Sequence, residues 1–306
     1  MSRALIDFAI FIAELILRIV FDILAAIVGP VIYILERIRA GPRKDFKHIL
    51  ITGGNSGLGE ALALAFAKPG VRIVLTARDA ARLKSVSEAV SAKGAEVVTH
   101  SVDVTNAEKM AEIIQKEDAQ VPLDLVIANA GVSSGTINTP GIAEATKPLM
   151  DINVQGVFNT VFPIMDSMVK RRRGQIAIMS SLASFFTQPE LGDYHTSKYA
   201  VRAFSESMRG MLGRYNVGMS VICPGFVESR MTAQAKRNIP LPFLMEAEPA
   251  AAIMKDGLER NVSVIAFPFP FSLLTQLFGA APAPIRSFIA LSFTNAKFVA
   301  RRLKVN

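Results

Sequence analysis

The chain has 306 residues, which is enough for one α/β domain of about 250 residues with extensions. Its net charge is +8, but the basic residues are not interleaved with aromatic ones, which argues against a nucleic-acid partner. The single cysteine, Cys223, excludes a disulfide within the chain, and the three histidines lack metal-ligand spacing, so we expect no metal site.

Hydrophobic residues make up 51% of the chain and are concentrated in residues 4–35 and 263–295. Four charged residues interrupt the first stretch, and on a helix they fall with Arg3 on one polar stripe. The longest run without charge, residues 23–35, is shorter than the roughly 20 residues that span a bilayer. We therefore expect residues 1–40 to form an amphipathic, membrane-embedded helical segment. A spanning helix and burial against a partner subunit are the alternatives.

Residues 36–47 are a basic linker with Gly41 and Pro42, and they predict a domain boundary. The arginines and lysines of this linker would lie at the lipid headgroups on the cytosolic side. A second basic run, residues 170–174, ends in glycine and is typical of a helix terminus, where cations interact favourably with the helix dipole. We prefer that interpretation to a nucleic-acid or targeting signal.

A strand, a glycine-rich turn and a helix follow the linker. The apolar residues 48–52 run into Gly53, Gly57 and Gly59, and an alanine-rich helix is expected over residues 60–68. Glycine lets the backbone approach a phosphate closely, and the helix N-terminus then faces the anion. This order indicates a dinucleotide site, with a plain glycine-rich turn as the alternative.

The end of the second predicted strand, residues 71–76, bears on the choice of dinucleotide. At this point an acid suits the free ribose 2′-hydroxyl of NAD(H), and an arginine suits the 2′-phosphate of NADP(H). Ala77 stands where the acid is expected and Arg78 follows it, so the sequence favours NADP(H). We expect Asp79 to cap the next helix, residues 80–93.

The alternation of strands and helices continues to residue 268. It predicts an α/β fold, a Rossmann-type doubly wound parallel sheet with helices on both faces and ligands at the carboxyl ends of the strands. Apolar helical extensions are expected outside this domain at both termini. The remaining expected strands are residues 96–102, 123–128, 175–179, 218–223 and 262–268, and the remaining helices are residues 107–116, 147–173 and 194–215.

Tyr194 and Lys198 are four residues apart, so on a helix they project from one face. A phenol alone is a poor proton donor at neutral pH, and an ammonium group beside it lowers its pKa. The pair therefore predicts a general acid/base that works near neutrality. A surface Tyr–Lys pair is the alternative.

As a whole, the pattern resembles the short-chain dehydrogenase/reductase family over about residues 47–268. Ser181 lies 13 residues before Tyr194, as that family places its catalytic serine, and Ser180 is the less favoured neighbour. The resemblance is carried by TGGNSGLG at 52–59, Asp103, NAG at 129–131, Asn153, Ser181, YHTSK at 194–198 and PG at 224–225.

The resemblance implies an oxidoreductase in which Tyr194 exchanges a proton with a carbonyl or alcohol while the cofactor supplies the hydride. Ser181 would bind the substrate oxygen. Lys198 would hold the nicotinamide ribose and lower the pKa of Tyr194. Asn153 would hold a water that links Lys198 to solvent. The alternatives are a turn residue for Ser181 and a core amide for Asn153.

The resemblance also implies contacts with NADP(H) along the carboxyl edge of the sheet. Asp103 could instead be only a helix cap. Ser229 departs from the threonine that is common in the family, which leaves its cofactor contact open. The implied cofactor-binding residues are Gly53, Asn55, Ser56, Gly57, Leu58, Gly59, Arg78, Asp103, Val104, Asn129, Ala130, Gly131, Tyr194, Lys198, Pro224, Gly225, Val227 and Ser229.

The expected substrate is hydrophobic, because apolar side chains dominate residues 231–245 and because Phe185 and Phe186 follow the serine. The alternative is that these residues only pack a lid onto the core. The tail, residues 269–306, is apolar with a basic end and is expected to join residues 1–40 in docking the catalytic domain, residues 41–268, on a membrane. The arrangement is similar to that of membrane-bound hydroxysteroid, retinol and ketosphinganine reductases.

The expected location is therefore a membrane with the catalytic domain facing the cytosol. This membrane is the endoplasmic reticulum or a lipid droplet in a eukaryote and the inner membrane in a bacterium. The resemblance also implies a homodimer or homotetramer built on residues 147–173. Two alternatives stay open, namely a soluble-metabolite reductase whose apolar ends serve oligomerisation and a non-catalytic dinucleotide-binding sensor or scaffold.

Overall fold

The computed structural model describes residues 43–133, 141–235 and 241–292, together with four single residues, 12, 294, 299 and 303. Apart from residue 12, the expected membrane segment and its Gly41-Pro42 boundary lie outside the described residues. Most of the chain after residue 292, including its basic end, lies outside them too. Among the helices of the described part, none has the length and apolar character that crossing a bilayer requires.

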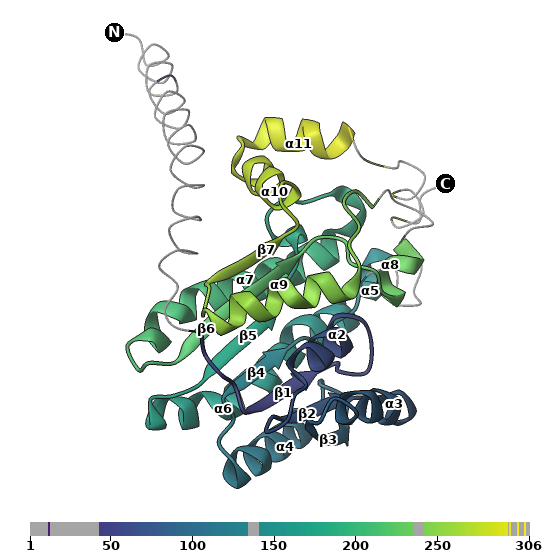
Figure 1. Cartoon of the computed structure of the whole chain (residues 1–306). Coiled ribbons are helices and arrows are strands. Elements are labelled where there is room, and N and C mark those ends of the chain that lie inside the picture. The colour runs from purple at the N-terminus through teal and green to yellow at the C-terminus, as the bar shows by residue number, and fades with distance from the viewer. Residues whose placement is uncertain are drawn as a thin grey trace.

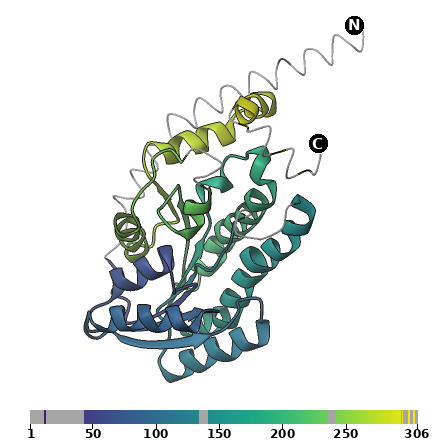
Figure 2. The ribbon, with the colours of Figure 1, turned by 90° about the vertical axis from the view of Figure 1, so that its right-hand side faces the viewer.

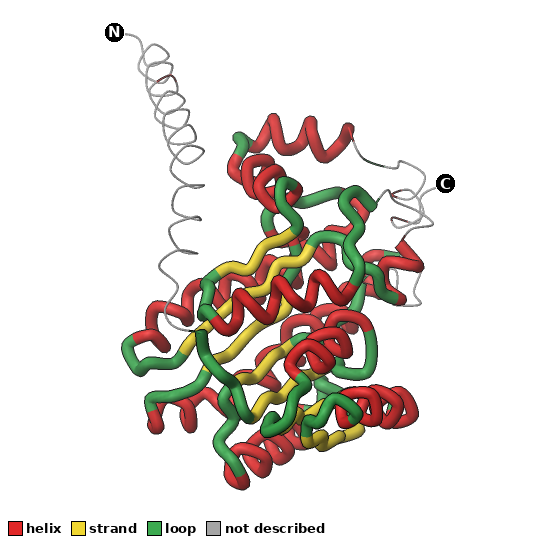
Figure 3. The backbone as a smooth tube through the Cα atoms, viewed as in Figure 1, coloured by secondary structure: helices red, strands yellow, loops and turns green. Residues whose placement is uncertain are grey.

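Seven parallel strands form one sheet in the order β3-β2-β1-β4-β5-β6-β7 (Figures 1 and 3). The order reverses between β1 and β4, and α/β folds bind ligands at the carboxyl edge of such a switch point. The predicted Rossmann-type sheet is thus confirmed. The strands are β1 His48–Thr52, β2 Arg72–Ala77, β3 Glu96–Ser101, β4 Leu125–Ala128, β5 Gln175–Met179, β6 Gly218–Pro224 and β7 Val264–Phe267.

Helices connect the strands and pack on both faces of the sheet (Figure 2). Short helical turns at Asp151–Gln155, which is π-helical, and at Leu182–Ser184 and Pro189–Leu191 interrupt the connections. The described helices are α2 Gly57–Phe66, α3 Ala80–Ser91, α4 Ala107–Gln120, α5 Ile142–Met150, α6 Gly156–Arg171, α7 Gly192–Gly213, α8 Arg230–Ala235, α9 Ala247–Glu259, α10 Phe271–Ala280 and α11 Ala283–Ser292.

Two cores lie on opposite faces of the sheet. Ile51 and Leu75 pack with α2, α3 and α9, while Leu50 and Val126 pack with α4, α6 and α7. Successive strand residues point to opposite faces, so neighbours such as Leu50 and Ile51 belong to different cores. All residues of β1, β4, β5 and β6 are buried, as is typical of parallel strands covered on both sides.

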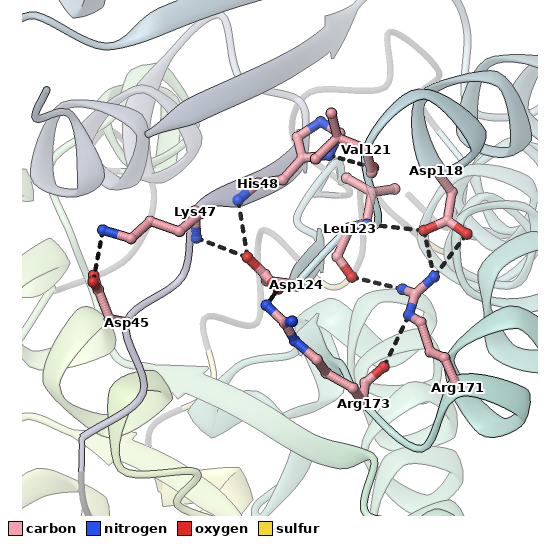
Figure 4. Close-up of polar contacts among 9 residues, drawn as sticks. All are labelled: Asp45, Lys47, His48, Asp118, Val121, Leu123, Asp124, Arg171 and Arg173. Atoms are coloured by element: carbon pink, nitrogen blue, oxygen red, sulfur yellow. Dashed lines mark hydrogen bonds and ion pairs between the residues drawn. The ribbon is translucent and has the colours of Figure 1, made fainter. Parts of the chain in front are cut away.

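The basic run after α6 serves the fold, as expected (Figure 4). Arg171 donates to both carboxylate oxygens of Asp118, at 2.7 and 2.8 Å, and α6 ends there. Arg173 pairs with Asp124 at 2.7 Å, and Asp124 also accepts from the backbone N–H groups of residues 47 and 48. The residue directly after the helix, Arg172, is left-handed with φ 52°, and Gly174 follows with φ 140°. These ion pairs tie the amino-terminal ends of β1 and β4 to α6.

The helix predicted over residues 147–173 begins earlier, at Ile142, and is divided by the π-helical turn Asp151–Gln155. Pro148 lies three residues before this turn, and Gly156 follows it directly. A Cβ on Gly156 would lie 2.7 Å from a methyl carbon of Val104, so glycine allows the helix to pass close to the end of β3. The extra turn of backbone carries Asn153, one of the expected catalytic residues.

Candidate active site

Tyr194 and Lys198 project from the first turns of α7 toward the carboxyl ends of β4 and β5. Lys198 Nζ lies 5.8 Å from the centre of the Tyr194 ring and donates a 3.0 Å hydrogen bond to the carbonyl oxygen of Met179, the last residue of β5. Only 4% of Lys198 is exposed. A Cβ on Gly131, just after β4, would lie 3.3 Å from this ammonium nitrogen. The pair is therefore held at the predicted edge, beside the dinucleotide turn.

The electrostatics of this pair differ from the expectation. Burial raises the pKa of Tyr194 above its ordinary value, and the hydrogen bond with the Ser181 hydroxyl opposes that rise only in part. Burial also lowers the pKa of Lys198 to about 8. The expected lowering of the Tyr194 pKa is thus wrong for this arrangement, because removal of the phenol from water outweighs the hydrogen bond with Ser181.

Ser181 and Ser180, adjacent in sequence, have different surroundings. The Ser181 hydroxyl bonds with Tyr194, accepts from the Ala183 N–H at 3.1 Å and lies 3.4 Å from the Pro224 carbonyl oxygen. The Ser180 hydroxyl is buried and donates to the Lys198 carbonyl oxygen at 2.9 Å. The Ser181 hydroxyl therefore lies beside the Tyr194 phenol, whereas the Ser180 hydroxyl holds the backbone of α7.

Asn153 is fully buried and belongs to the π-helical turn. Its side-chain oxygen accepts from the Val132 N–H at 2.8 Å, and its amide nitrogen donates to the Val132 carbonyl oxygen at 2.9 Å. The same nitrogen donates to the Ser197 hydroxyl at 3.0 Å. Asn153 thus ties the loop segment after β4 to α7 next to Lys198, the arrangement that the core-amide alternative describes.

The glycine turn between β1 and α2 is built from backbone positions that favour glycine. Gly53 has φ +65° and Gly57 has φ +57°, conformations that favour glycine. A Cβ on Gly59 would overlap the carbonyl oxygen of Gly53, so α2 begins very close to β1. Ser56 precedes α2 without making a side-chain capping bond to it. Asn55 lies within the turn, and Leu58 packs on the core.

The residues after β4 complete the wall beside this turn. Asn129 donates from its side chain to the Thr52 carbonyl oxygen at 2.8 Å, and the Thr52 hydroxyl accepts from the N–H groups of Asn129 and Ala130 at 3.0 and 3.1 Å. A Cβ on Gly53 would come within 2.9 Å of the Ala130 backbone. The ends of β1 and β4 are therefore locked together at the point where a dinucleotide would cross them.

At the ends of β2 and β3, Arg78 and Asp103 form an ion pair of 3.5 Å. Partial burial acts to raise the pKa of Asp103, but hydrogen bonds from the Thr105 N–H and hydroxyl, together with Arg78, bring it below its ordinary value. Asn106 caps α4, so Asp103 is not that cap, whereas Asp79 caps α3 as predicted. Asp103 also borders an open hollow of about 340 Å³, whose other lining residues are Thr105, Pro148, Asp151, Ile152 and Gln155.

The expected nicotinamide border follows β6. Gly225 donates from its N–H to the Phe267 carbonyl oxygen at 2.7 Å, and Val227 is buried and pairs with Met245. The Ser229 side chain accepts from the Thr232 N–H at 3.2 Å and thereby caps α8. A Cβ on Gly57 would lie 3.4 Å from the Ser229 Cβ, so this border closes against the glycine turn.

Two residues that the sequence did not single out for this role hold the loop after Ser181. His195 Nδ1 donates to the Ala183 carbonyl oxygen at 2.6 Å, and its Nε2 accepts from the Gln188 N–H at 3.1 Å. Arg202 donates to the Ser184 carbonyl oxygen at 3.1 Å, and its guanidinium lies 4.4 Å from the centre of the Phe185 ring. His195 stands inside the Tyr194–Lys198 motif, where it was weighed only as a metal ligand. Among the described residues, no group of three or more potential metal ligands occurs.

Comparison with known proteins assigns the family. The family model of short chain dehydrogenases matches residues 47–240. An uncharacterized oxidoreductase from Myxococcus xanthus (strain DK1622) is 36% identical over 243 residues, which are 79% of this chain and 95% of the relative.

Two solved structures share the fold. A short-chain dehydrogenase from Sphingobium yanoikuyae in complex with NADPH has a TM-score of 0.67 at 23% identity, covering 82% of this chain and 97% of its own. A short chain dehydrogenase from Mycobacterium paratuberculosis bound to NAD has a TM-score of 0.62 at 24% identity, covering 74% and 96%. The family model and the relative from Myxococcus xanthus agree with this fold. The chain therefore belongs to the short-chain dehydrogenase/reductase family and is an oxidoreductase of that type.

Proposed function

We propose that the protein interconverts a carbonyl and a secondary or primary alcohol on a hydrophobic, lipid-like substrate, with NADP(H) as its cofactor. A steroid, a retinoid, a ketosphinganine and a long-chain keto compound belong to this substrate class. The observation that carries the proposal is the convergence of the Tyr194 phenol, the Ser181 hydroxyl and the Lys198 ammonium beside the glycine turn.

In this proposal the bound cofactor supplies or accepts a hydride, and the residues of the chain handle the proton and the substrate oxygen. Ser181 donates a hydrogen bond to that oxygen, and Tyr194 gives it a proton in reduction or takes one in oxidation. The raised pKa of Tyr194 keeps the phenol protonated at neutral pH and so suits reduction. Lys198 holds the nicotinamide ribose, and Asn153 fixes the backbone beside it.

The charge at the end of β2 supports NADP(H) over NAD(H). Arg78 is largely exposed. Within the described structure it forms an ion pair with Asp103, at 3.5 Å. Asp79 is turned to α3 through its bond with the Arg82 N–H at 3.1 Å. A 2′-phosphate would replace the weak ion pair of Arg78 with a stronger, charge-assisted one.

Aromatic side chains near Ser181 support an apolar substrate. The Phe226 and Phe243 rings lie 6.1 and 5.5 Å from the Phe271 ring, so the segment after β6 meets the start of α10. Phe186, in the loop after Ser181, and Phe278, near the end of α10, have ring centres 5.8 Å apart. Phe243 remains 51% exposed. Such a rim suits substrates that bury aliphatic or fused-ring carbon.

The polarity of α10 is reversed relative to a helix on a water-exposed surface, and this supports docking on a membrane. Ser272 and Thr275 are buried against the domain, while Leu274 and Leu277 are 38% and 39% exposed. On α11, Phe288 is 73% exposed. An apolar outer face of this kind marks a surface that another apolar phase covers, and the apolar residues 4–35 favour lipid as that phase. We propose that the catalytic domain faces the cytosol from this membrane.

Liposome flotation tests the docking. The full chain should float with vesicles of phosphatidylcholine and phosphatidylserine, and Leu277→Glu with Phe288→Glu should reduce the floated fraction. Val121→Glu, at an exposed apolar site that follows α4, should float like the wild type. Equal flotation of all three proteins would remove α10 and α11 from the docking surface.

A second surface supports self-association. Phe162 on α6 is 52% exposed and stacks on Phe158 at 5.2 Å, and Phe204 of α7 lies 5.0 Å from Phe158. We propose that these helices form the contact of a homodimer or homotetramer. Light scattering on the purified protein should give a multiple of the chain mass, and Phe162→Glu should lower it to the monomer.

The reaction is tested with purified protein, NADPH and two kinds of ketone. We expect oxidation of NADPH with 2-decalone or 2-tridecanone and little with dihydroxyacetone. Tyr194→Phe should lose turnover by about 10²- to 10⁴-fold while NADPH still binds, as measured by nucleotide fluorescence. Retained turnover in this variant would assign the proton to another group, and a preference for dihydroxyacetone would favour a soluble-metabolite reductase. NADPH binding without turnover of any carbonyl would favour a non-catalytic sensor.

A further inference from the structure

Gly279 of α10 packs directly on the backbone of the loop that follows Ser181. A Cβ on Gly279 would overlap the carbonyl oxygen of Phe185 and would lie 2.9 Å from its carbonyl carbon. The backbone of Gly279 is not in the left-handed region, so its conformation does not require glycine. The close approach of helix and loop does require it, because the obstructing atoms belong to backbone and cannot rotate away.

The same helix contacts the loop at two further points. Phe278 meets Phe186 edge-on, with ring centres 5.8 Å apart. Phe271, the first residue of α10, packs with Phe185 against a small core that includes Leu182. Both ends of α10 therefore bear on the few residues that follow Ser181 (Figure 1 shows α10 above β7).

The helix α7 also holds the loop, through His195 and Arg202, as described above. Within the loop, the Ser184 hydroxyl donates to the Ser181 carbonyl oxygen at 2.7 Å, and the Ala183 N–H donates to the Ser181 hydroxyl at 3.1 Å. The loop thus contacts two helices, and the Ser181 carbonyl oxygen and hydroxyl each form a hydrogen bond within it. A displacement of Phe185 would be transmitted to the Ser181 hydroxyl.

We propose that α10 positions the catalytic serine, and that Gly279 is the positioning residue, because its close contact with Phe185 sets the Ser181 hydroxyl against the Tyr194 phenol. The helix with the reversed polarity is then part of the catalytic architecture as well as of the outer surface. This inference rests on the proposed carbonyl reduction. It goes beyond that proposal by assigning a role to a residue that touches neither substrate nor cofactor.

Gly279→Ala tests the role, with Gly210→Ala as its matched control. Gly210 lies in α7, and a Cβ there would meet nothing within 4 Å. Both substitutions add one methyl group to a helix and gain the same intrinsic helix propensity. For reduction of 2-decalone we expect Gly279→Ala to lower kcat about tenfold or more, since small misplacements of catalytic groups have large effects. Gly210→Ala should match the wild type, and the NADPH dissociation constant should stay unchanged in both variants.

The pH profile separates positioning from a general loss of stability. The hydrogen bond from Ser181 lowers the pKa of Tyr194, so a displaced Ser181 should move the rise of 2-decalol oxidation to higher pH in Gly279→Ala. The other titratable groups around the phenol are Asp193, His195 and Lys198 of α7 and Cys223 of β6, and neither variant alters them. A protein that is only less stable would lose active fraction without this shift.

Unchanged kcat and an unchanged pH profile in folded Gly279→Ala would overturn the inference. If that variant does not fold, Phe278→Ala removes the contact with Phe186 without inserting an atom. It should lower kcat severalfold with the same alkaline shift, and wild-type behaviour there would likewise overturn the inference. Failure of the underlying function is distinguishable, because then the wild type would not reduce 2-decalone or Tyr194→Phe would remain active.

Discussion

The Lys198 ammonium donates its 3.0 Å hydrogen bond to the carbonyl oxygen of Met179 from a position that water barely reaches. Burial lowers its pKa from 10.5 to about 8, so the folded state disfavours the charged form. The unfolded chain therefore binds more protons than the folded one between about pH 8 and 10.5, and stability from this group rises with pH across that window. Below pH 8 its destabilising contribution is fully present.

Lys198→Met should reveal this contribution. Relative to the variant, the wild type should gain up to about 3 kcal/mol in the free energy of unfolding as pH rises from 8 to 10.5. Urea denaturation at a series of pH values measures the difference. A difference that is constant over the window would mean that Lys198 is not held with a lowered pKa.

Replacement of the two adjacent serines should separate catalysis from packing. Ser181→Ala should lower kcat by about 10²- to 10³-fold, because it removes a donor to the substrate oxygen. Ser180→Ala should keep kcat within a few-fold and lower stability by about 1 kcal/mol, because its hydroxyl bonds the α7 backbone and the Cys223 side chain. Steady-state kinetics and thermal melts of both variants decide this. A larger kinetic loss in Ser180→Ala would transfer the role to Ser180.

The ion pair of Arg78 with Asp103 predicts how the cofactor preference responds to substitution. Arg78→Ala should weaken NADPH binding by about tenfold or more, the size of one charge-assisted hydrogen bond, and should change NADH binding much less. Arg82→Ala is the control, because Arg82 lies one turn further on and pairs with Asp79 at 3.2 Å. Nucleotide titrations followed by fluorescence give the dissociation constants. Equal losses for NADPH and NADH would contradict 2′-phosphate recognition by Arg78.

A buried acid away from the active site governs stability. Glu117 is 2% exposed and pairs with Arg72 at 3.0 Å and with His100 at 2.9 Å. Burial acts to raise its pKa, but these two partners bring it below the ordinary 4.5, so the stabilisation is present above pH 4.5 and is lost as pH falls below it. Glu117→Gln should lose about 3 kcal/mol at pH 7.

The loss in Glu117→Gln should shrink as the pH falls below 4.5, as followed by denaturant titration. Glu112→Gln in the same helix should change little, because Glu112 is exposed and pairs only with Lys109 in the described structure. Equal losses of stability in the two variants would show that the pairs of Glu117 are not strengthened by its burial.

The central strands were predictable from the sequence because both of their faces are buried. Residues 48–52 and 175–179 are uninterrupted apolar or β-prone runs with turn residues after them, and the structure reproduces their bounds. The helix expected over 147–173 was less accurate, since neither its start at Ile142 nor its π-helical turn has a local signal. The turn ends at Gly156, which packs closely on Val104, a residue distant in sequence.

In the site, residue types and spacing located Tyr194, Lys198 and Ser181, which the fold brings together. The direction of the Tyr194 pKa was wrong because it depends on how much water the fold removes, and a four-residue spacing carries no such information. The braces His195 and Arg202 bind backbone carbonyl groups of the loop after Ser181. Those partners exist only once that loop and α7 are packed together.

The contact between Gly279 and residue 185 is made to a peptide group, which every amino acid possesses. This contact therefore does not depend on which side chain stands at position 185, whereas a Cβ at position 279 would overlap the peptide oxygen. A saturation library scored for turnover should accept more substitutions at 185, where the ring also contacts Arg202, than at 279. A new C-terminal segment grafted onto this scaffold to alter its specificity should therefore keep glycine at position 279.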